Sequence, residues 1–394
     1  MDVTNPSNSC YDTIVLGAGI QGSFTAYHLA KNKRRTLLIE QFILPHSRGS
    51  SHGQTRITRM GYQEDYYTRM MKDCFTLWAQ LESEAKVKIY SHTGLLLFGK
   101  NDDKQLGKIQ RTMKHSGNPP EILTHDDFTR KFPNVSLQPG EVAFMDRVAG
   151  VLYANQALLT VQKLFQDMGG VIRDREKVID IQPGNLVTVK TASGAYKAKS
   201  LVITAGPWTN SVLNQIALQL PLKTLRINVC YWKEKVAGTY GLSHNFPCFI
   251  GSDVCNTGHD IYGLPSNEYP GLMKICYHSG EESDPEKRDI IGRGTPQDIK
   301  ILGEFVKKYF PGLESEPAVV ESCMYTCTPD NNFILDCHPV HENIIIGAGF
   351  SGHGFKLSPV VGKILCELSM GKTPSHDISP FKMNRFSIKL KSAL

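Results

Sequence analysis

The stretch that most limits the fold of this chain lies near its start, where a glycine-rich turn separates an apolar strand from a helix. Residues 12–40 contain a strand (TIVL), the turn GAGIQG, a helix (SFTAYHLAKN) and a second strand (RTLLIE). Alternation typical of a strand gives way to helical spacing, over the length expected of a strand–helix–strand crossover. Because such a crossover joins parallel strands, we expect residues 12–40 to open a parallel, Rossmann-like sheet.

The turn and the end of the second strand predict a nucleotide site. Gly17, Gly19 and Gly22 have the GxGxxG spacing, which permits a tight turn, close approach of a pyrophosphate and packing of the helix on the sheet. Amides at the helix N-terminus can then donate to phosphate oxygens. Glu40 ends the second strand, where a carboxylate accepts hydrogen bonds from a ribose hydroxyl. A turn kept only for packing can show the same glycines, but the flanking elements and Glu40 favour dinucleotide binding.

The rest of the chain predicts a mixed α/β (α+β) fold with a discontinuous dinucleotide-binding domain. The segment NIIIGA, further glycines and the helix SPVVGKILCELSM near the C-terminus are typical of a last strand that rejoins the first sheet. Aromatic and β-branched strands such as LRINVCYWKE and GLMKICYH predict an antiparallel substrate domain between these parts. The predicted dinucleotide-binding domain comprises 1–90, 150–220 and 320–394, and the predicted substrate domain comprises 91–149 and 221–319.

Two further helices are predicted at about 154–168 and 296–309, where apolar residues recur with helical spacing. The net charge is +6, and the basic residues are scattered among acidic ones, which favours small anionic ligands over nucleic acid. The longest apolar stretches fall short of the roughly 18 residues of a membrane span, so no membrane association is expected. The first residues, MDVTNPSNSCYD, lack the pattern of a secretory signal, and we expect an intracellular protein.

The cysteines do not predict disulfides or a metal site. Ten cysteines are spread over 394 residues without a CxxC pair, so we expect them to be reduced. Cys323 and Cys327 are four residues apart and share a face of an extended strand, but no second pair completes a zinc site. We therefore predict no metal. Taken alone, Cys323 is most simply an inert core residue.

Five short stretches contain the remaining candidates for chemistry. They are PHSRGSSHGQTRITR, TAGPWTN, GLMKICYH, CMYTCTPD and GAGFSGHGFKLSPVVGK. Together with the Gly17 turn, and in this order and spacing, they resemble the monomeric sarcosine oxidase family of FAD-dependent amine oxidases over nearly the whole chain. The resemblance implies an FAD-binding domain and oxidase activity on amino acids.

The resemblance also implies how FAD is held. It places a thioether between Cys323 and the 8α-methyl group of FAD, an 8α-S-cysteinyl linkage, and it requires no thiol at Cys327. A loop histidine without a ligand is the alternative for His353. The implied cofactor-binding residues are Gly17, Gly19, Gly22, Glu40, Ser51, His52, Arg56, Cys323, Gly352, His353 and Lys356.

The substrate contacts are implied in the same way. Arg59 pairs with the substrate carboxylate, Lys356 is its second ligand, and Arg56 lies against the flavin on the opposite side. An extended segment sends arginines three apart to opposite sides, and a guanidinium grips a carboxylate bidentately while an ammonium adds a point charge. From the residues alone, a solvated basic face for both arginines and a surface position for Lys356 are the open alternatives.

Four more residues complete the implied active site. Lys274 and His278 are four apart in a strand and share a face. The resemblance puts Lys274 beside flavin N5, where oxygen reacts, and His278 near the substrate. Tyr262 and Tyr325 line the cavity, although aromatic residues in strands are more often plain core.

The implied activity is oxidation of a secondary amino acid (sarcosine, L-pipecolate or L-proline) at the C–N bond to an imine, with reduction of O2 to H2O2, by a monomer. The alternatives are an FAD-dependent dehydrogenase with another acceptor and a noncatalytic FAD-binding protein. Peroxide production suits a peroxisome, and the chain ends in Ser392-Ala393-Leu394, which departs from Ser-Lys-Leu at its middle residue. A peroxisomal import receptor is the expected partner of this ending, and an unread tail is the alternative.

Overall fold

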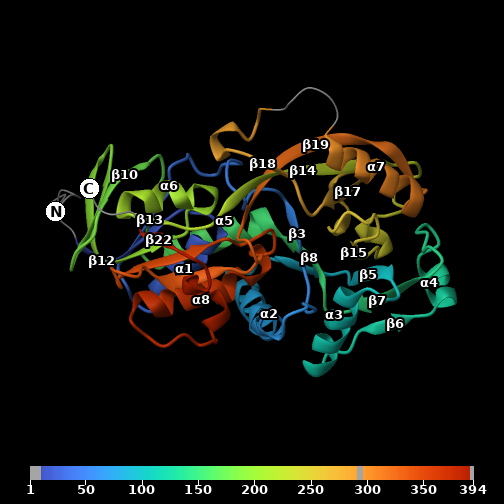
Figure 1. The fold of residues 1–394 in the computed structure, drawn as a ribbon, viewed down its shortest axis with the longest axis horizontal. Helices are drawn as coiled ribbons and strands as arrows, with labels where there is room; N and C mark the ends of the chain where they lie inside the picture. Colours follow the sequence, from blue (N-terminus) through green and yellow to red (C-terminus); the bar gives the residue numbers. More distant parts are fainter. Residues whose placement is uncertain (1–9, 291–295, 391–394) are drawn as a thin grey trace.

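Two large sheets organise the protein, one at each end of the elongated shape in Figure 1. The computed structural model describes residues 10–290 and 296–390. Ser392-Ala393-Leu394 and the first nine residues lie outside these ranges, so the expectations placed on them remain predictions. A third, smaller sheet has three strands. Its strands are β3 Thr55–Thr58, β8 Gly150–Tyr153 and β4 Tyr90–His92.

The first large sheet contains the predicted crossover. β1 pairs in parallel with β2 and β12, and β12 pairs in parallel with β21, so four strands run the same way at its centre. This confirms that the segment near the C-terminus rejoins the first sheet. The strands are β1 Cys10–Leu16, β2 Thr36–Ile39, β9 Val171–Arg173, β10 Val178–Gln182, β11 Val187–Thr191, β12 Gly194–Ile203, β20 Ile334–Cys337 and β21 Ile344–Ala348.

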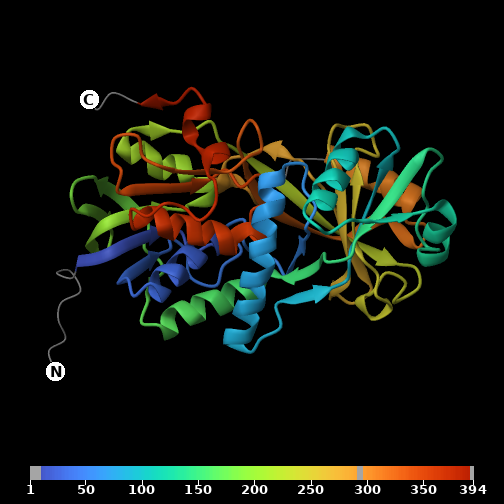
Figure 2. The ribbon, with the colours of Figure 1, turned by 90° about the horizontal axis from the view of Figure 1, so that it is seen from below.

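Helices cover this sheet. Helix α1 packs against α5 and α8, and these helices share one apolar core with α2. Helix α2 runs across the junction between the two large sheets in both views (Figures 1 and 2). The bounds are α1 Ile20–Lys31, α2 Asp65–Ala85, α5 Ala154–Asp167 and α8 Ser358–Ser369, with the short α6 Thr209–Leu213 on the opposite side. The predicted helix at 154–168 is confirmed.

The second large sheet has nine strands and packs against α7 Gln297–Tyr309, which confirms the predicted helix at 296–309. Its pairs are antiparallel, as predicted, except that β5 and β15 run parallel. After β5 the chain passes through the first sheet before it returns as β15 beside β5. This long connection allows the two strands to run parallel. The strands are β5 Leu95–Lys100, β6 Glu121–Leu123, β7 Glu141–Asp146, β14 Lys223–Glu234, β15 Cys248–Ser252, β16 Ile261–Tyr269, β17 Leu272–Tyr277, β18 Glu281–Glu282 and β19 Leu313–Cys327.

The mixed α/β fold is therefore confirmed. The proposed domain boundaries remain a prediction, and one detail bears on them: β19 pairs along β14, so Cys323 is carried by the nine-stranded sheet. The remaining elements are α3 Lys104–His115, α4 His125–Lys131, β13 Leu218–Gln219 and β22 Lys389–Leu390. Every helix in the described ranges is too short or too polar to span a bilayer.

Candidate active site

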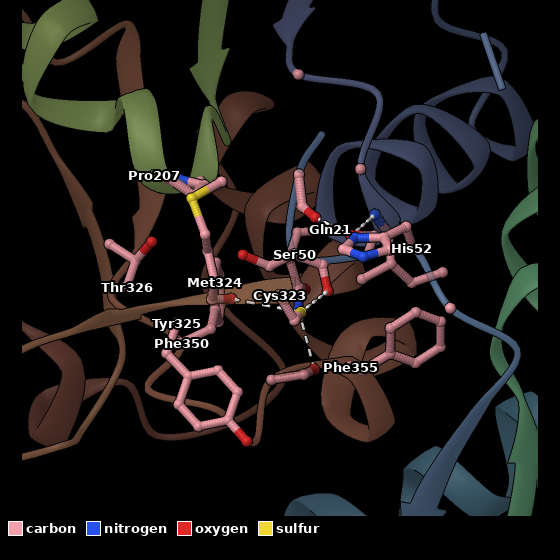
Figure 3. Close-up of a pocket in the computed structure, with 18 of the residues that line it drawn as sticks. Gln21, Ser50, His52, Pro207, Cys323, Met324, Tyr325, Thr326, Phe350 and Phe355 are labelled. Carbon is pink, nitrogen blue, oxygen red and sulfur yellow. Dashed lines mark hydrogen bonds between the residues drawn. The ribbon is translucent and has the colours of Figure 1, made fainter. Parts of the chain in front are cut away.

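A cavity of about 370 Å³ extends from the glycine turn of the first sheet to the nine-stranded sheet. Nearly all residues that the sequence singled out line it. From the first sheet it is lined by the turn at Gly17 and by Glu40, and from the second by Lys274 and Cys323. Figure 3 shows its central part, where Cys323 lies among Ser50, His52 and Phe355.

The glycine turn has no room for side chains. Gly17 has φ of +96°, and a Cβ atom there would lie 2.5 Å from the carbonyl oxygen of Thr204. A Cβ atom at Gly22 would lie 2.0 Å from the carbonyl oxygen of Gly17. At the start of α1 the amide of Ile20 donates to the Ser51 hydroxyl at 3.0 Å. The protein's own backbone therefore requires glycine at Gly17 and Gly22, which agrees with the tight turn and close helix packing that the spacing predicts.

Glu40 holds the turn from the end of β2. It is buried, and its Oε2 accepts the amide of Ala18 at 2.9 Å while its Oε1 accepts the amide of Phe42 at 3.1 Å. His46 Nε2 lies 3.5 Å from the same Oε1. Each carboxylate oxygen can accept more than one hydrogen bond, so Glu40 can serve both the turn and a ribose.

Arg56, which also lines the cavity, is fixed by backbone carbonyl groups. Its guanidinium donates to the carbonyl oxygens of Thr55 at 2.7 Å, Ser50 at 3.0 Å and His52 at 2.5 Å. It lies 5.4 Å from the centre of the Phe355 ring. Burial lowers the pKa of His52 to about 4, so this histidine is neutral. The loop that carries Ser51 and His52 is thus held on the strand that carries Arg56.

The two cysteines of β19 differ in their surroundings. Cys323 lines the cavity and is 8% exposed, with Sγ 4.0 Å from the carbonyl oxygen of Ser50. Cys327 does not line the cavity, and burial raises its pKa to about 11. Cys323 is thus accessible from the cavity and Cys327 is not.

Strand register explains why residues distant in sequence meet in the cavity. Residues directly opposite in a ladder point to the same face of the sheet. Cys323 pairs with Ile227, and two residues further along, Tyr325 pairs with Leu225. In the next ladders Lys274 pairs with Tyr231, and Tyr262 pairs with Cys276. These positions all differ by even steps, so one face of the nine-stranded sheet carries Tyr262, Lys274, Cys323 and Tyr325.

Two cations converge at one side of the cavity. The Arg59 guanidinium lies 4.5 Å and the Lys356 ammonium 5.9 Å from the centre of the same Tyr62 ring. Lys356 donates to the carbonyl oxygen of His353 at 3.4 Å. Within the described ranges neither cation forms an ion pair with a carboxylate. Burial, followed by the charges of Arg59 and Arg56, holds the pKa of Lys356 well below its usual range.

The positions of these cations follow from their elements. Arg56 lies within β3 and Arg59 just after it, and the two guanidinium groups contact different surroundings, as expected of an extended segment. Lys356 lies in the short 3₁₀ helix η6 Phe355–Leu357, whose backbone is anchored because Trp78 of α2 donates to the Lys356 carbonyl oxygen at 3.0 Å.

His278 and two tyrosines form a hydrogen-bonded group beside the cations. The Tyr325 hydroxyl lies 3.1 Å from the Tyr262 hydroxyl and 3.3 Å from His278 Nδ1. Burial, followed by the charges of Lys356 and Arg59, lowers the pKa of His278 to about 3. The imidazole is therefore neutral at physiological pH. Both tyrosines line the cavity and are not plain core.

The loop after β21 closes this side. Gly352 has φ of +79°, and a Cβ atom there would lie 2.5 Å from the Tyr325 ring. His353 bonds through Nε2 to the carbonyl oxygen of Asn331 at 3.1 Å, and its buried Nδ1 has no hydrogen-bond partner within residues 10–290 and 296–390. Burial holds the pKa of His353 well below its usual range.

The sequence analysis missed the acids of the site. Glu268 pairs with Lys274, with Oε1 2.9 Å from Nζ. Asp260 lines the cavity, and burial raises its pKa while Arg59 opposes the rise. Asp146 also feels the charge of Arg59, but it accepts the amides of Met60 and Gly61. The only sequence signal for Glu268 was an acid six residues before a lysine, which is too common to be informative.

The residues present fit FAD. Gln21 lines the cavity, and its buried Oε1 has no hydrogen-bond partner in the part of the chain that the structure describes. Gly17 and Gly22 have no room for a Cβ atom, and Gly17, Gly19 and the start of α1 line the cavity, as expected of a pyrophosphate site. The cavity joins this turn to the face that carries Cys323. Among the described residues no three His, Cys, Asp or Glu side chains are grouped to hold a metal ion.

Comparison with known proteins agrees with this geometry. The model of the family described as "FAD dependent oxidoreductase" matches residues 12–368, and the chain belongs to this family. It is 56% identical over 377 residues to the peroxisomal sarcosine oxidase of Homo sapiens, across 95% of this chain and 96% of the relative. The monomeric sarcosine oxidase of Bacillus sp. (strain B-0618) is 35% identical, across 96% and 97% of the two chains.

The solved structures include NikD, an unusual amino acid oxidase essential for nikkomycin biosynthesis, in its open form. It matches with a TM-score of 0.82 at 22% identity, over 98% of this chain and 99% of that one. At this identity the match bears on the fold alone. It supports the assignment of two sheets with the cavity between them to the fold of this family.

Proposed function

We propose that the protein is an FAD-dependent oxidase of secondary amino acids such as sarcosine, L-pipecolate or L-proline. The names of the relatives support the reaction class, since both curated relatives are sarcosine oxidases. The geometry of the cavity supports the same class of substrate. The assignment predicts an imine and hydrogen peroxide as products.

The observation that carries this proposal is a pair of cations, Arg59 and Lys356, that form no ion pair with a carboxylate in the part of the chain that the structure describes. The buried Lys356 ammonium, with the half-buried Arg59 guanidinium beside the same aromatic ring, is costly unless an anion binds between the two cations. Arg59 offers a planar fork for two carboxylate oxygens, and Lys356 adds a second positive charge. An α-amino or α-imino acid supplies such a carboxylate, whereas a simple amine does not.

The same charges select the form of the amine that is bound. Two cations disfavour a third positive charge nearby, so the substrate nitrogen is held as the neutral amine. The neutral amine has the lone pair that forms the C=N bond as a hydride, a hydrogen with two electrons, leaves a carbon bonded to the nitrogen. His278, which is neutral because its pKa is lowered to about 3, adds no further positive charge. Together with Tyr325 and Tyr262 it orients the substrate for reaction.

When bound, FAD accepts two electrons from the amino acid and passes them to dioxygen. Arg56, Ser51, His52, Gly352 and His353 are the residues that we expect to hold its ring, and the Gly17 turn and Glu40 its nucleotide end. Lys274 lines the cavity on the sheet face and supplies a positive charge where negative charge develops on oxygen.

A covalent tether through Cys323 is part of the proposal. Its support is the position of the Cys323 thiol at the cavity wall, which Cys327 does not line. Acid precipitation of the protein should leave a yellow pellet, and Cys323→Ser should release the colour into the supernatant. Cys327→Ser is the matched control and should keep the pellet yellow. A colourless wild-type pellet would refute the tether.

A substrate panel tests the activity itself. Sarcosine, L-pipecolate and L-proline should each be tested for oxygen uptake and peroxide release, with glycine as a primary amine for comparison. Peroxide equal to the oxygen consumed supports an oxidase. Flavin bleaching without peroxide would indicate a dehydrogenase with another acceptor. No bleaching by any secondary amino acid under anaerobic conditions would indicate a noncatalytic FAD-binding protein.

We further propose a peroxisomal monomer. The support is the name of the human relative and that of the bacterial monomeric enzyme. Fusion of the last residues, Lys391 to Leu394, to a fluorescent reporter tests whether they direct import, with Leu394 deleted as the control.

A further inference from the structure

A buried acid, Glu268, contacts Lys274 at the wall of the cavity. Lys274 lines the cavity, as do Thr55 and Glu321, whereas Glu268 does not. The Nζ–Oε1 distance is 2.9 Å, and the two side chains are only 8% and 4% exposed. An ammonium has three hydrogens, so one bond to Glu268 leaves two for the cavity.

Glu268 is itself held in place by hydroxyl groups. Thr55 of β3 donates a short hydrogen bond to Oε1, and Tyr231 of β14 donates to Oε2 at 2.7 Å. The carboxylate thus connects β3, at the residue before Arg56, to the sheet that carries Lys274. With two donors and an ammonium around it, Glu268 has little freedom to move.

A second acid supports the first. The Tyr231 hydroxyl also lies 3.3 Å from Glu321 Oε2, and Tyr269 donates to Glu321 Oε1 at 2.5 Å. The Tyr231 and Tyr269 rings pack edge to face with centroids 4.8 Å apart. This network leads from Lys274 toward the outer end of the β16–β17 hairpin. A packed network of this kind fixes the rotamers of its members.

The charge state agrees with a working ion pair. Burial alone raises the pKa of Glu268, but the charge of Lys274 and the bonds from Thr55, Tyr231 and Lys274 outweigh it, and the pKa lies below its usual range. The acid is therefore ionised at physiological pH. A buried ammonium with such a partner stays charged at a lower cost than one without.

We propose that Glu268 is a positioning residue for oxygen reduction, which fixes the Lys274 ammonium at the cavity wall in the orientation that dioxygen meets. The inference rests on the proposed role of Lys274. Glu268 touches neither substrate nor cofactor in this account and acts through the lysine alone. Removal of its charge should therefore affect only the half of the reaction that uses dioxygen.

The test compares Glu268→Gln, Lys274→Met and the double variant in both half-reactions of the holoenzyme. We expect Glu268→Gln to lower the second-order rate constant for reoxidation by dioxygen at least about tenfold. The rate of anaerobic reduction by sarcosine and the KM for sarcosine should change less than about threefold. Because the two residues act together, reoxidation in the double variant should be no slower than in Lys274→Met.

A thermal-unfolding cycle on the same purified proteins gives a readout that does not depend on turnover. Each single variant leaves a buried charge without its partner and should lower the unfolding midpoint by several degrees. The double variant should regain part of this loss. Strictly additive losses would show that the two side chains are not coupled and would overturn the inference.

The other possible outcomes of these experiments also support or overturn the proposed role of Glu268. Unchanged or faster reoxidation in Glu268→Gln, with Lys274→Met impaired, overturns the inference and leaves the role of Lys274 intact. Unchanged reoxidation in Lys274→Met overturns the proposed oxygen role itself. Should Glu268→Gln fail to fold, Glu268→Asp retains the charge one carbon shorter and is expected to slow reoxidation to an intermediate degree. An unaffected Glu268→Asp would count against positioning. Glu304→Gln, which breaks the exposed pair with Lys307 on α7, is the matched control.

Discussion

Two buried lysines line the same cavity in opposite electrostatic settings. Lys274 has a carboxylate 2.9 Å away, whereas Lys356 donates to a carbonyl oxygen at 3.4 Å, pairs with no carboxylate among the described residues and shares its surroundings with Arg59. Their exposed fractions are similar, 6% and 9%. The two lysines therefore do not differ in burial. They differ in whether the protein itself supplies a carboxylate partner. The comparison indicates that the protein itself balances the charge of Lys274, whereas a ligand balances the charge of Lys356.

The difference has a physical reason. A buried cation costs free energy, and the cost is offset either by a protein carboxylate or by an anion from outside. At Lys274 the protein carboxylate keeps the charge in place whether or not substrate is present. At Lys356 the lack of a protein carboxylate among the described residues leaves a site that favours a carboxylate ligand. Predictions that exchange or remove these charges separate the two roles.

The largest effect is expected from Lys274→Met. Loss of the charge beside the reacting oxygen should slow reoxidation by about 100- to 1000-fold. Anaerobic reduction by sarcosine should stay close to the wild-type rate, because this half-reaction depends on the other cations. Stopped-flow spectroscopy of the flavin absorbance measures both steps. Equal slowing of both would contradict the division of labour.

The stability of the two lysine variants should differ in sign. Lys274→Met leaves Glu268 buried and unpaired and should lower the free energy of unfolding by about 3 kcal/mol. Lys356→Met removes an uncompensated cation and should leave it unchanged or raise it by about 1 kcal/mol. Urea denaturation without substrate measures both. A loss in Lys356→Met as large as in Lys274→Met would show that Lys356 has a counterion after all.

Arg59→Lys sharpens the role of the second region. The charge is kept, but the planar fork that binds two carboxylate oxygens is lost, and kcat/KM for sarcosine should fall about 10- to 100-fold. The reoxidation rate should not change. Steady-state kinetics at saturating oxygen measures the first effect. A fall of less than twofold would argue that charge alone binds the substrate.

The smallest effect concerns pH. Because the pKa of Lys356 is held low in the free protein by burial and by the charge of Arg59, a bound carboxylate raises it and protons are taken up. Affinity for propionate, which carries no amine, should therefore fall as the pH rises, by at most about tenfold per pH unit. Calorimetric titration in two buffers of different ionisation enthalpy measures the uptake. Lys356→Met should abolish it, whereas uptake in that variant would implicate another group.

Local patterns were enough to predict much of the fold. The crossover at 12–40, the strand that rejoins the first sheet and the helices at 154–168 and 296–309 depend on spacing over a few turns, and all are found. The parallel β5–β15 pair was not foreseen, because a long connection leaves no local trace of strand direction. Likewise, nothing near Lys274 in sequence indicated that Glu268 faces it. The ladder between β16 and β17 shifts register between Leu264 and Tyr269, and such an irregularity follows from packing.

The sequence by itself determined that the chain opens with a nucleotide-binding turn and carries cysteine, arginine and lysine in stretches typical of a flavin amine oxidase. The turn rests on glycine conformation and short-range spacing, whereas the amine-oxidase stretches are identified by their resemblance to the monomeric sarcosine oxidase family. Only the tertiary structure decided which lysine has a carboxylate partner. Charge pairing between residues in different strands depends on register and burial, and these are set when the sheets pack.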